Sequence, residues 1–306
     1  MRPAFRLSPP RAAVLGAAAL ITLALAGCSP QDDDASSAPS SAPPATGAAS
    51  TAATAAACAP GSLPTRSPGK LTVGTDNPAY DPWFSDNTPS NGKGYESAVA
   101  YAVAKQLGFA QDQVVWRKVP FNSAFAPGAK DFDFDVNQVS ISADRAKAVD
   151  FSPGYYDVRQ AVIAAKGSKI FGAHSLADLK DAKLGAQVGT TSLDVIKNVV
   201  RPGKQPAVFQ RNDLAVAALK NGQVDGIVVD LPTAFYITGA EVTDAKVVGQ
   251  FADTGGTPEQ FGLVLDKGSK LTSCVSQAVT SLRADGTLAA LEKQWLSDAV
   301  GAPVLK

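Results

Sequence analysis

Strand-like and helix-like patterns alternate along most of this chain, and that alternation restricts the fold more than any other feature. Residues 71–74 predict a short strand, and 96–107 place Val99 and Val103 at helical spacing before Gly108 ends the helix. Strands that are regularly separated by helices indicate an α/β fold with largely parallel sheets. Further strands are expected at 114–116, 132–136, 183–188, 207–209 and 225–229, and further helices at 192–200, 214–219, 232–237, 271–282 and 287–295.

Two apolar strands, predicted at 161–165 and 261–265, are each followed by Lys-Gly-Ser-Lys. They enclose about a hundred residues that have strand and helix patterns of their own. We therefore expect the chain to leave one lobe and later return to it through a paired crossing that forms a hinge. The expected division assigns 67–162 with 263–306 to a first lobe, and 163–262 to a second.

The first 27 residues have the order of a secretory signal peptide. Three basic residues precede a 15-residue apolar run from 12 to 26, which is shorter than the roughly 20 residues of a membrane-spanning helix. The run ends in Leu-Ala-Gly-Cys, which resembles the bacterial lipobox, in which the cysteine receives a diacylglyceryl group. We expect 1–27 to be removed and the exported protein to be anchored through Cys28 at the outer face of the bacterial cytoplasmic membrane.

Residues 28–66 have the composition of a tether. From 29 to 57, 25 of 29 residues are Ala, Ser, Thr, Pro or Gly. Such a segment buries too little apolar surface to offset its chain entropy, so we expect it to be disordered and to hold the folded domain away from the membrane.

Charge and residue counts exclude several classes of function. The chain has 28 basic and 28 acidic residues, which removes the electrostatic case for binding nucleic acid. The single histidine, His174, excludes sites built from several imidazoles, and no metal or other cofactor is expected. No hydrolase elbow, P-loop, zinc-site spacing or dinucleotide fingerprint occurs, so no catalytic residues are predicted.

The three cysteines give an odd count. With Cys28 acylated, Cys58 and Cys274 remain in an oxidising compartment, and we expect them to form a disulfide. Two free thiols are the alternative, because a sequence does not show whether the Cα atoms lie within bridging distance.

A set of groups suited to a zwitterion follows three of the predicted strands. Ser140 and Arg145 come after the strand that ends at Val139, and a guanidinium can grip a carboxylate bidentately. Gly-Thr-Thr at 189–191 opens a helix whose free N–H groups suit the same carboxylate, and Asp230 ends a strand where it can meet an ammonium. All lie at strand C-termini, the edge where open α/β sheets bind ligands.

Local roles are the alternatives for the two charged residues. Arg145 could form an ion pair with Asp144 or Asp150, and Asp230 could act as a helix N-cap.

The chain from about 69 to 296 resembles the bacterial extracellular solute-binding proteins of family 3, the amino-acid receptors of ABC importers. The matching pieces are Leu-Thr-Val-Gly-Thr-Asp at 71–76, Gly-Tyr-Glu at 94–96, Val-Ser-Ile-Ser-Ala-Asp-Arg at 139–145, Val-Asp-Phe-Ser at 149–152 with the tyrosines at 155–156, Gly-Thr-Thr at 189–191, and 225–230. The resemblance implies the type II periplasmic-binding-protein fold, in which two α/β lobes are joined by a two-strand hinge.

The resemblance also implies roles for individual residues. Arg145 would bind the ligand α-carboxylate with help from Ser140, Thr190 and Thr191, and Asp230 would bind the α-amine. The remaining matched positions would line the cleft, with Gln187 helping to choose the side chain, Phe121 and Trp83 as apolar or aromatic walls, and Asp76 and Tyr80 beside them.

We therefore expect a monomer that captures an amino acid by lobe closure and delivers it to the permease subunits of an ABC importer. Gln187 and Phe121 permit a polar uncharged side chain such as that of glutamine, while Arg211 and several acids leave acidic or basic ligands open. The alternatives are an enzyme on the same fold, such as one resembling cyclohexadienyl dehydratase, and a lipoprotein that presents its ligand to a separate sensor.

Overall fold

The computed structural model describes residues 58, 61–252, 258–296 and 301–306, which belong to one compact unit spanning 46–306. The predicted signal peptide, the predicted lipidation site Cys28 and most of the predicted tether lie outside the described residues. No helix in the described part of the chain is both long and apolar enough to cross a membrane.

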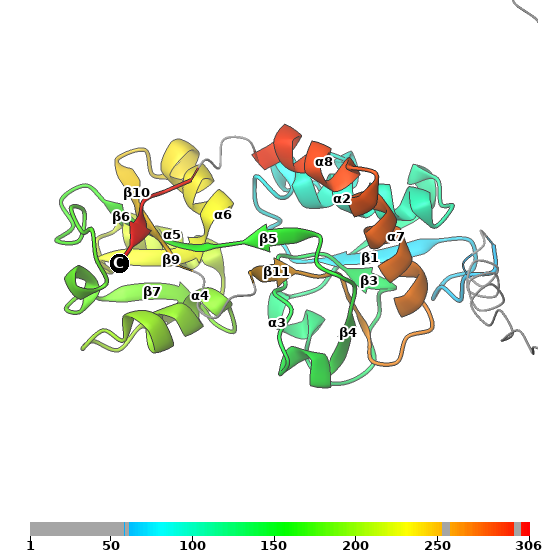
Figure 1. Ribbon diagram of the computed structural model, residues 1–306, viewed down its shortest axis with the longest axis horizontal. Coiled ribbons are helices and arrows are strands. Elements are labelled where there is room, and N and C mark those ends of the chain that lie inside the picture. Colours follow the sequence, from blue (N-terminus) through cyan, green and yellow to red (C-terminus); the bar gives the residue numbers. More distant parts are fainter. Residues whose placement is uncertain (1–57, 59–60, 253–257, 297–300) are drawn as a thin grey trace, which may run out of the picture. The chain divides into compact units, whose positions relative to one another are not determined.

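The first lobe is built on a five-stranded mixed sheet (Figure 1). β1 runs parallel to β2 and β3, whereas β12, which belongs to the returning chain, runs antiparallel to β3 and β4. All five residues of β1 are buried, as in a central strand that is covered on both faces. In order across the sheet, the strands are β2 (Val114–Lys118), β1 (Leu71–Thr75), β3 (Phe134–Asp135), β12 (Val264–Asp266) and β4 (Val149–Phe151).

Three helices from distant parts of the chain pack together in the first lobe. Val99 and Val103 of α2 are fully buried in one apolar cluster with Val275 and Val279 of α7. The early and late segments of the chain therefore share a core. The helices are α2 (Tyr95–Gln106), α7 (Thr272–Ala284) and α8 (Thr287–Leu296), and the shorter turns are η1 (Ser85–Asn87), η2 (Pro89–Asn91), η3 (Gln111–Gln113), α3 (Phe121–Ala124) and η4 (Arg145–Lys147).

The second lobe is built on a six-stranded mixed sheet. β7 runs parallel to β8 and β9, while β6 runs antiparallel to β9 and β10. The sheets are thus mixed rather than largely parallel, because the strands near each crossing reverse direction. In order across this sheet, the strands are β13 (Val304–Leu305), β10 (Ala245–Phe251), β6 (Gln160–Ala165), β9 (Gly226–Asp230), β7 (Leu184–Gln187) and β8 (Ala207–Phe209).

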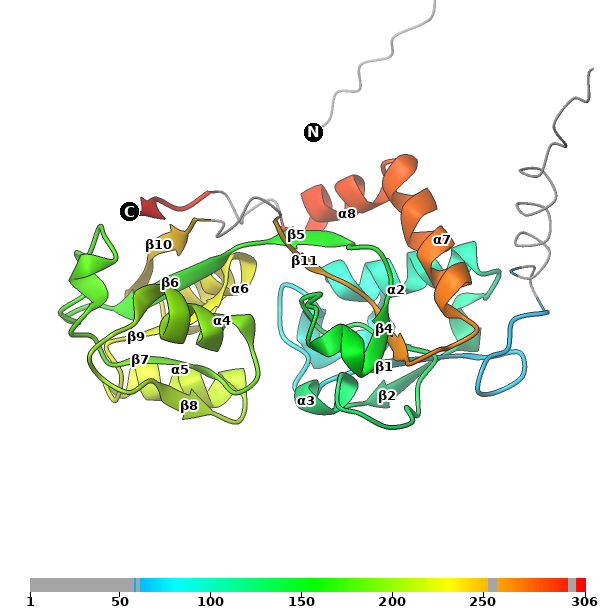
Figure 2. The ribbon, with the colours of Figure 1, turned by 60° about the horizontal axis from the view of Figure 1, so that its bottom comes forward.

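Helices cover both faces of the six-stranded sheet, as Figure 2 shows for α4 and α6. Val162 and Ala164 of β6 pack in a cluster with Leu193, whereas the alternate residues Ala161 and Ile163 pack in another cluster with α5 and α6. This alternation is the period of two that a strand requires. The helical segments are η5 (Ala177–Leu179), α4 (Thr191–Asp194), which continues as η6 (Val195–Val200), α5 (Asn212–Lys220), α6 (Leu231–Tyr236) and η7 (Ile237–Glu241).

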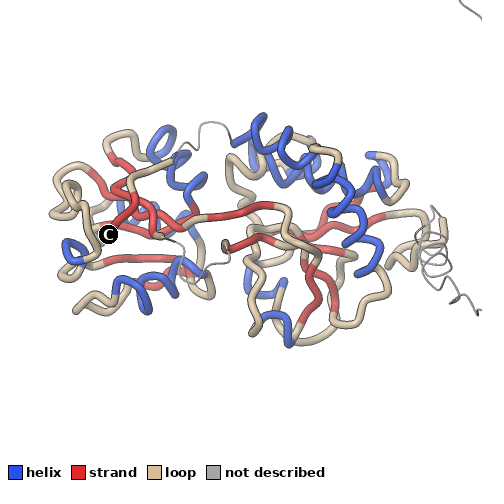
Figure 3. Tube along the Cα trace, in the orientation of Figure 1, coloured by secondary structure: helices blue, strands red, loops and turns tan. Residues whose placement is uncertain are grey.

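Two short strands join the lobes. β5 (Tyr156–Val158) pairs antiparallel with β11 (Glu259–Phe261), and the pair lies between the two larger groups of strands (Figure 3). The pairing falls a few residues earlier in the chain than predicted. The repeated Lys-Gly-Ser-Lys segments follow β6 and β12 in separate sheets, where Gly167 and Gly268 take positive φ values of 89° and 73° in turns. The lobe boundaries stay a prediction.

The last residues of the chain pair with the second lobe. Val304–Leu305 runs parallel to β10, and Leu305 is buried in the cluster that contains Val162. The sequence had placed all of 263–306 in the first lobe. That division misses the final pairing, because a two-residue strand carries no period of its own.

The expected disulfide between Cys58 and Cys274 is present, with a Cα–Cα distance of 5.4 Å. It ties the start of the folded region to α7.

Changing both cysteines to alanine should lower the free energy of unfolding by about 2–4 kcal/mol, since the bond restricts the unfolded chain. Guanidinium unfolding would measure the loss. Dithiothreitol should lower the stability of the wild type to that of the variant. A variant with the same free energy of unfolding as the wild type would contradict a stabilising role of the disulfide.

Candidate functional site

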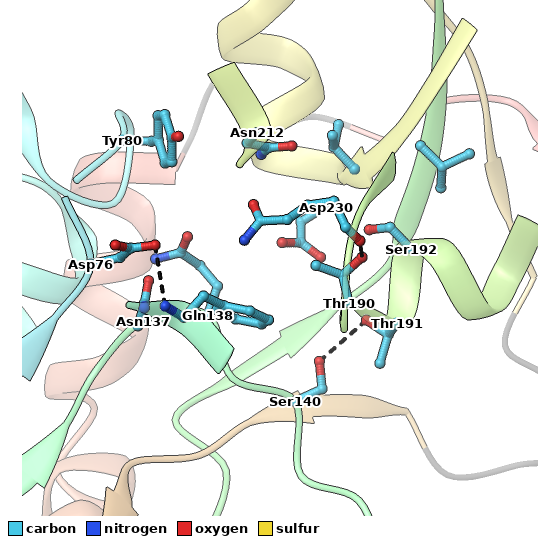
Figure 4. Close-up of a pocket in the computed structure, with 14 residues that line it drawn as sticks. Asp76, Tyr80, Asn137, Gln138, Ser140, Thr190, Thr191, Ser192, Asn212 and Asp230 are labelled. Atoms are coloured by element: carbon cyan, nitrogen blue, oxygen red, sulfur yellow. Dashed lines mark hydrogen bonds between the residues drawn. The ribbon is translucent and has the colours of Figure 1, made fainter. Parts of the chain in front are cut away.

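A cavity lies where strand ends of the two sheets face each other. It has about 540 Å³ of space between its atoms, and part of that space is open to solvent. Eight of the ten residues predicted to bind ligand line it, and Figure 4 shows most of them directed toward the same space. These eight are Asp76, Tyr80, Phe121, Ser140, Gln187, Thr190, Thr191 and Asp230. Arg145 and Trp83 are not among the lining residues.

Six further lining residues were not predicted. Five of them lie within two residues of a predicted site residue or directly follow a predicted strand, which was the available signal, but Val228 and Val229 were assigned only to the strand at 225–229; Asn212 gave no such signal. They are Asn137, Gln138, Ser192, Asn212, Val228 and Val229.

The Arg145 guanidinium connects the two lobes. Its Nη1 donates to the carbonyl oxygen of Ser140 at 2.6 Å, and its Nη2 donates to that of Gly189 in the other lobe at 2.8 Å. The guanidinium carbon lies 4.3 Å from the centre of the Phe125 ring, within cation–π range. Burial lowers the pKa of Arg145, yet a guanidinium keeps its charge at neutral pH. This cation therefore stands beside the cavity with both described bonds made to neutral carbonyl groups.

Arg145 does not form the ion pair with Asp144 or Asp150 that was the alternative to a ligand-binding role. Asp144 pairs with Lys147 at 2.6 Å, and Asp150 pairs with Lys267 at 3.1 Å. Neither acid neutralises the guanidinium.

The helical segment that begins at Thr191 presents its first turn to the cavity. Thr190 is its N-cap, and its hydroxyl accepts from Leu193 N at 3.2 Å. The Thr191 hydroxyl lies 3.4 Å from that of Ser140 in the other lobe. Gly189 has a φ of +76°, and a Cβ there would lie only 2.1 Å from Asn122 Oδ1, so glycine permits this close approach. Hydroxyl and N–H groups consequently converge near Arg145.

Asp230 forms the acidic side of the site. Its Oδ1 accepts from Gln160 Nε2 at 2.7 Å. It occupies the N-cap position of α6, but its side chain makes no capping bond there. Burial and the nearby Glu259 raise the pKa of Asp230 to about 8. The ionised form of Asp230 is therefore destabilised in the empty cavity, and a cation that enters the cavity would stabilise it.

Glu259 adds a second acid that the sequence reasoning did not identify. Its Oε1 accepts from the Ser140 hydroxyl at 2.5 Å and lies 3.4 Å from Gln160 Nε2. Because 119 residues separate Glu259 from Ser140, no local pattern in the sequence could have revealed it.

Polar groups also surround the end of the cavity away from Asp230. Asp76 accepts from the backbone N–H of Asn77 at 2.6 Å and of Phe121 at 3.3 Å, and burial raises its pKa. The Tyr80 hydroxyl donates to Asp213 of the other lobe at 3.3 Å. Figure 4 shows Asp76 and Asn212 on different sides of this space.

Trp83 lies in the core rather than on the cavity wall. It is fully buried and makes edge contacts with Tyr95, Tyr156 and Phe261, at centroid distances of 6.1, 5.4 and 5.5 Å. Its Nε1 donates to the Thr233 hydroxyl at 2.9 Å. An indole this large buries more apolar area among other rings than it would at a polar cavity.

The arrangement suits recognition of a small zwitterion. A helix start and the Asp230 carboxyl group line the cavity, and the Arg145 guanidinium and the Glu259 carboxyl group lie beside it, each bonded to Ser140. Within the described ranges, no group of three or more His, Cys, Asp or Glu side chains could hold a metal ion.

The chain belongs to the bacterial extracellular solute-binding proteins, family 3, whose model matches residues 71–298. The expected family and the expected fold class, the type II periplasmic-binding-protein fold with two α/β lobes and a two-strand hinge, are confirmed. The relatives described next are named as amino-acid-binding proteins.

A probable histidine-binding protein of Neisseria gonorrhoeae is 26% identical over 228 residues, which cover 74% of this chain and 82% of that protein. The ABC transporter glutamine-binding protein GlnH of Bacillus subtilis strain 168 is 27% identical over 221 residues, covering 70% and 77%. A solved ancestral arginine-binding protein bound to arginine has a TM-score of 0.62 and 30% identity, and the match covers 74% of this chain and 98% of that one.

The raised pKa of Asp230 predicts a pH-dependent stability of the ligand-free protein. Between the ordinary value of 3.8 and about 8, the unfolded chain releases a proton that the folded protein keeps. Rising pH therefore destabilises the wild type, by at most about 1.4 kcal/mol per pH unit for one proton. Asp230→Asn should lose this component, so its stability relative to the wild type should increase from pH 4 to 8 and level off above that.

Urea unfolding at several pH values would measure the difference. Asp144 is the control, because Lys147 lowers the pKa of this exposed acid and it titrates below this range. Asp144→Asn should keep the wild-type slope between pH 5 and 8, and an equal slope in Asp230→Asn would show that Asp230 does not hold the proton.

Proposed function

We propose that this protein is the extracytoplasmic substrate-binding lipoprotein of an ABC importer, which captures a polar amino acid between its lobes. The observation that carries the proposal is that Asp230 lines a cavity formed by both lobes, while the Arg145 guanidinium lies beside that cavity and bonds to Ser140 of one lobe and Gly189 of the other. A ligand that contacts both lobes favours the closed arrangement through those contacts. Its release to a membrane permease would follow when the lobes separate.

Arg145 is assigned to the ligand α-carboxylate. The guanidinium lies beside Ser140 and Gly189, and the Thr191 hydroxyl, 3.4 Å from that of Ser140, would share the same anion, with Thr190 capping the start of that helix. A carboxylate enclosed here would replace bonds to neutral carbonyls with a charge-assisted pair.

Asp230 is assigned to the ligand ammonium. Entry of a cation would offset the burial that raises the pKa of Asp230 and restore its charged form. Glu259 stands near enough to strengthen the same negative field.

The side chain of the ligand is assigned a polar character. Asn137, Gln138, Gln187 and Asn212 supply both donors and acceptors to the cavity, and Asp76 supplies an acceptor. The relatives named above bind ligands as different as histidine, glutamine and arginine, so family membership leaves this choice to the lining residues.

Lipid attachment at Cys28 is part of the same proposal. The basic residues, the apolar run and the Leu-Ala-Gly-Cys segment support it, and the tether of 28–66 would let the domain reach a permease while remaining anchored. The domain is proposed to act as a monomer at the outer face of the cytoplasmic membrane.

A thermal-shift screen of the twenty amino acids tests the function, because a ligand that binds the native state raises its melting temperature. Arg145→Ala should weaken binding of the amino acid found in the screen by on the order of 100-fold or more, since it leaves a carboxylate enclosed without its charge partner. Arg117→Ala changes an exposed arginine and should bind normally. Calorimetry that found wild-type affinity in Arg145→Ala would refute the assignment.

The lipid anchor predicts a second phenotype. Cys28→Ala should abolish incorporation of labelled palmitate in bacterial cells, because the thiol that accepts the diacylglyceryl group is gone. Cys58→Ala, which changes a disulfide cysteine instead, should keep the label. Labelled protein in the Cys28 variant would exclude this cysteine as the anchor.

A further inference from the structure

One buried hydrogen bond joins the lobes outside the ligand cavity. Trp83 Nε1 of the first lobe donates to the Thr233 hydroxyl of α6 in the second at 2.9 Å. Trp83 is 0% exposed and Thr233 is 5% exposed. Neither residue lines the cavity, so neither would touch a ligand held there.

Trp83 is fixed against both connecting strands. Its ring makes edge contacts with Tyr156 of β5 and Phe261 of β11, and its backbone carbonyl accepts from Glu96 N at the start of α2. The indole is therefore held in one orientation by the first lobe and the hinge together, which reduces the entropy lost when it forms a bond across the lobes.

Thr233 is coupled to the site through a single helical turn. It lies three residues after Asp230, and both occur where β9 ends and α6 begins. α6 packs in the same apolar cluster as β6 and β9, so this turn moves with the second lobe. Rotation about β5 and β11 would thus separate Thr233 from Trp83.

A hollow that is partly open to solvent lies between the lobes near this bond. It has about 670 Å³ of space between its atoms and is lined by Pro82 and Trp295 of the first lobe and by Pro232 and Phe235 of the second. The lobes can part here without opening either apolar core. On separation, water would satisfy the indole N–H and the hydroxyl.

We propose that Trp83 and Thr233 are positioning residues, whose hydrogen bond forms only on closure and strengthens the binding of every ligand by the same factor. This inference rests on the proposed function. A contact that exists only in the closed state raises the population of that state, and apparent affinity scales with that population whatever the ligand. Residues that line the cavity, in contrast, change the affinity for one ligand relative to another.

Four variants test the proposal. Trp83→Phe removes the indole N–H, Thr233→Val removes the hydroxyl at nearly constant shape, and the double variant removes both. Each should weaken the binding of two different amino acids by the same factor, about two- to tenfold, as expected for one buried hydrogen bond. The double variant should be no weaker than the weaker single one, because only one bond is lost. Thr233→Ser keeps the hydroxyl and should bind both amino acids as tightly as the wild type.

Trp116→Phe is the matched control. It removes an indole hydrogen bond of 3.1 Å to the Tyr101 hydroxyl, but that bond lies wholly within the first lobe. It should leave the dissociation constants unchanged, even where it lowers the melting temperature. Unchanged affinity in both Trp83→Phe and Thr233→Val, additive losses in the double variant, or losses that differ between ligands would overturn the proposal.

Failure of the proposed function would be visible separately, because the wild type would then bind none of the amino acids. The closing contact can be measured without a ligand as well, from energy transfer between dyes at the exposed positions 105 and 197 of the two lobes. Thr233→Val should lower the closed fraction, whereas Trp116→Phe should not. Equal closed fractions in the wild type and Thr233→Val would reject the contact as a determinant of closure.

Discussion

Charged groups enclosed between two lobes lose much of their hydration, and each ion costs several kcal/mol unless a partner compensates for that loss. In this protein the cost falls on Asp230, which lines the cavity, and on Arg145 and Glu259, which both bond to the lining residue Ser140. Neutral carbonyls and amides supply the bonds that Arg145 and Asp230 make in the described structure. The site is therefore polarised toward a ligand that carries both charges.

The arrangement of the two sheets couples ligand binding at these charged residues to a movement of whole lobes. Each sheet delivers its functional side chains at strand ends, and the short β5–β11 pair is the narrow connection between the sheets. A ligand that bonds to both sides of the cavity restricts rotation of the lobes about that connection. Contacts outside the cavity, such as that of Trp83 with Thr233, contribute to the equilibrium between open and closed arrangements without involving the lining residues.

Much of this architecture could be predicted from the sequence because its signals are local. The apolar run that became β9 and the Gly-Thr-Thr before α4 each carry a period or a helix start within a few residues. What was missed depends on distant contacts. Glu259 lies on a short polar strand with no clear period, and the place of Trp83 follows from rings far along the chain. The sequence predicted Trp83 as an aromatic wall of the cleft, and no local pattern indicated that it would be buried in the core or which partner its N–H would find.

In the proposed function, one amino acid is held between the lobes by its charged ends. A crystal structure of the protein grown with the amino acid that stabilises it most would test this directly. The ligand carboxylate should lie on the Arg145 guanidinium and the ammonium within hydrogen-bonding distance of Asp230, with both lobes in contact with the ligand. A ligand bound to one lobe alone, or with its ends away from these two residues, would contradict it.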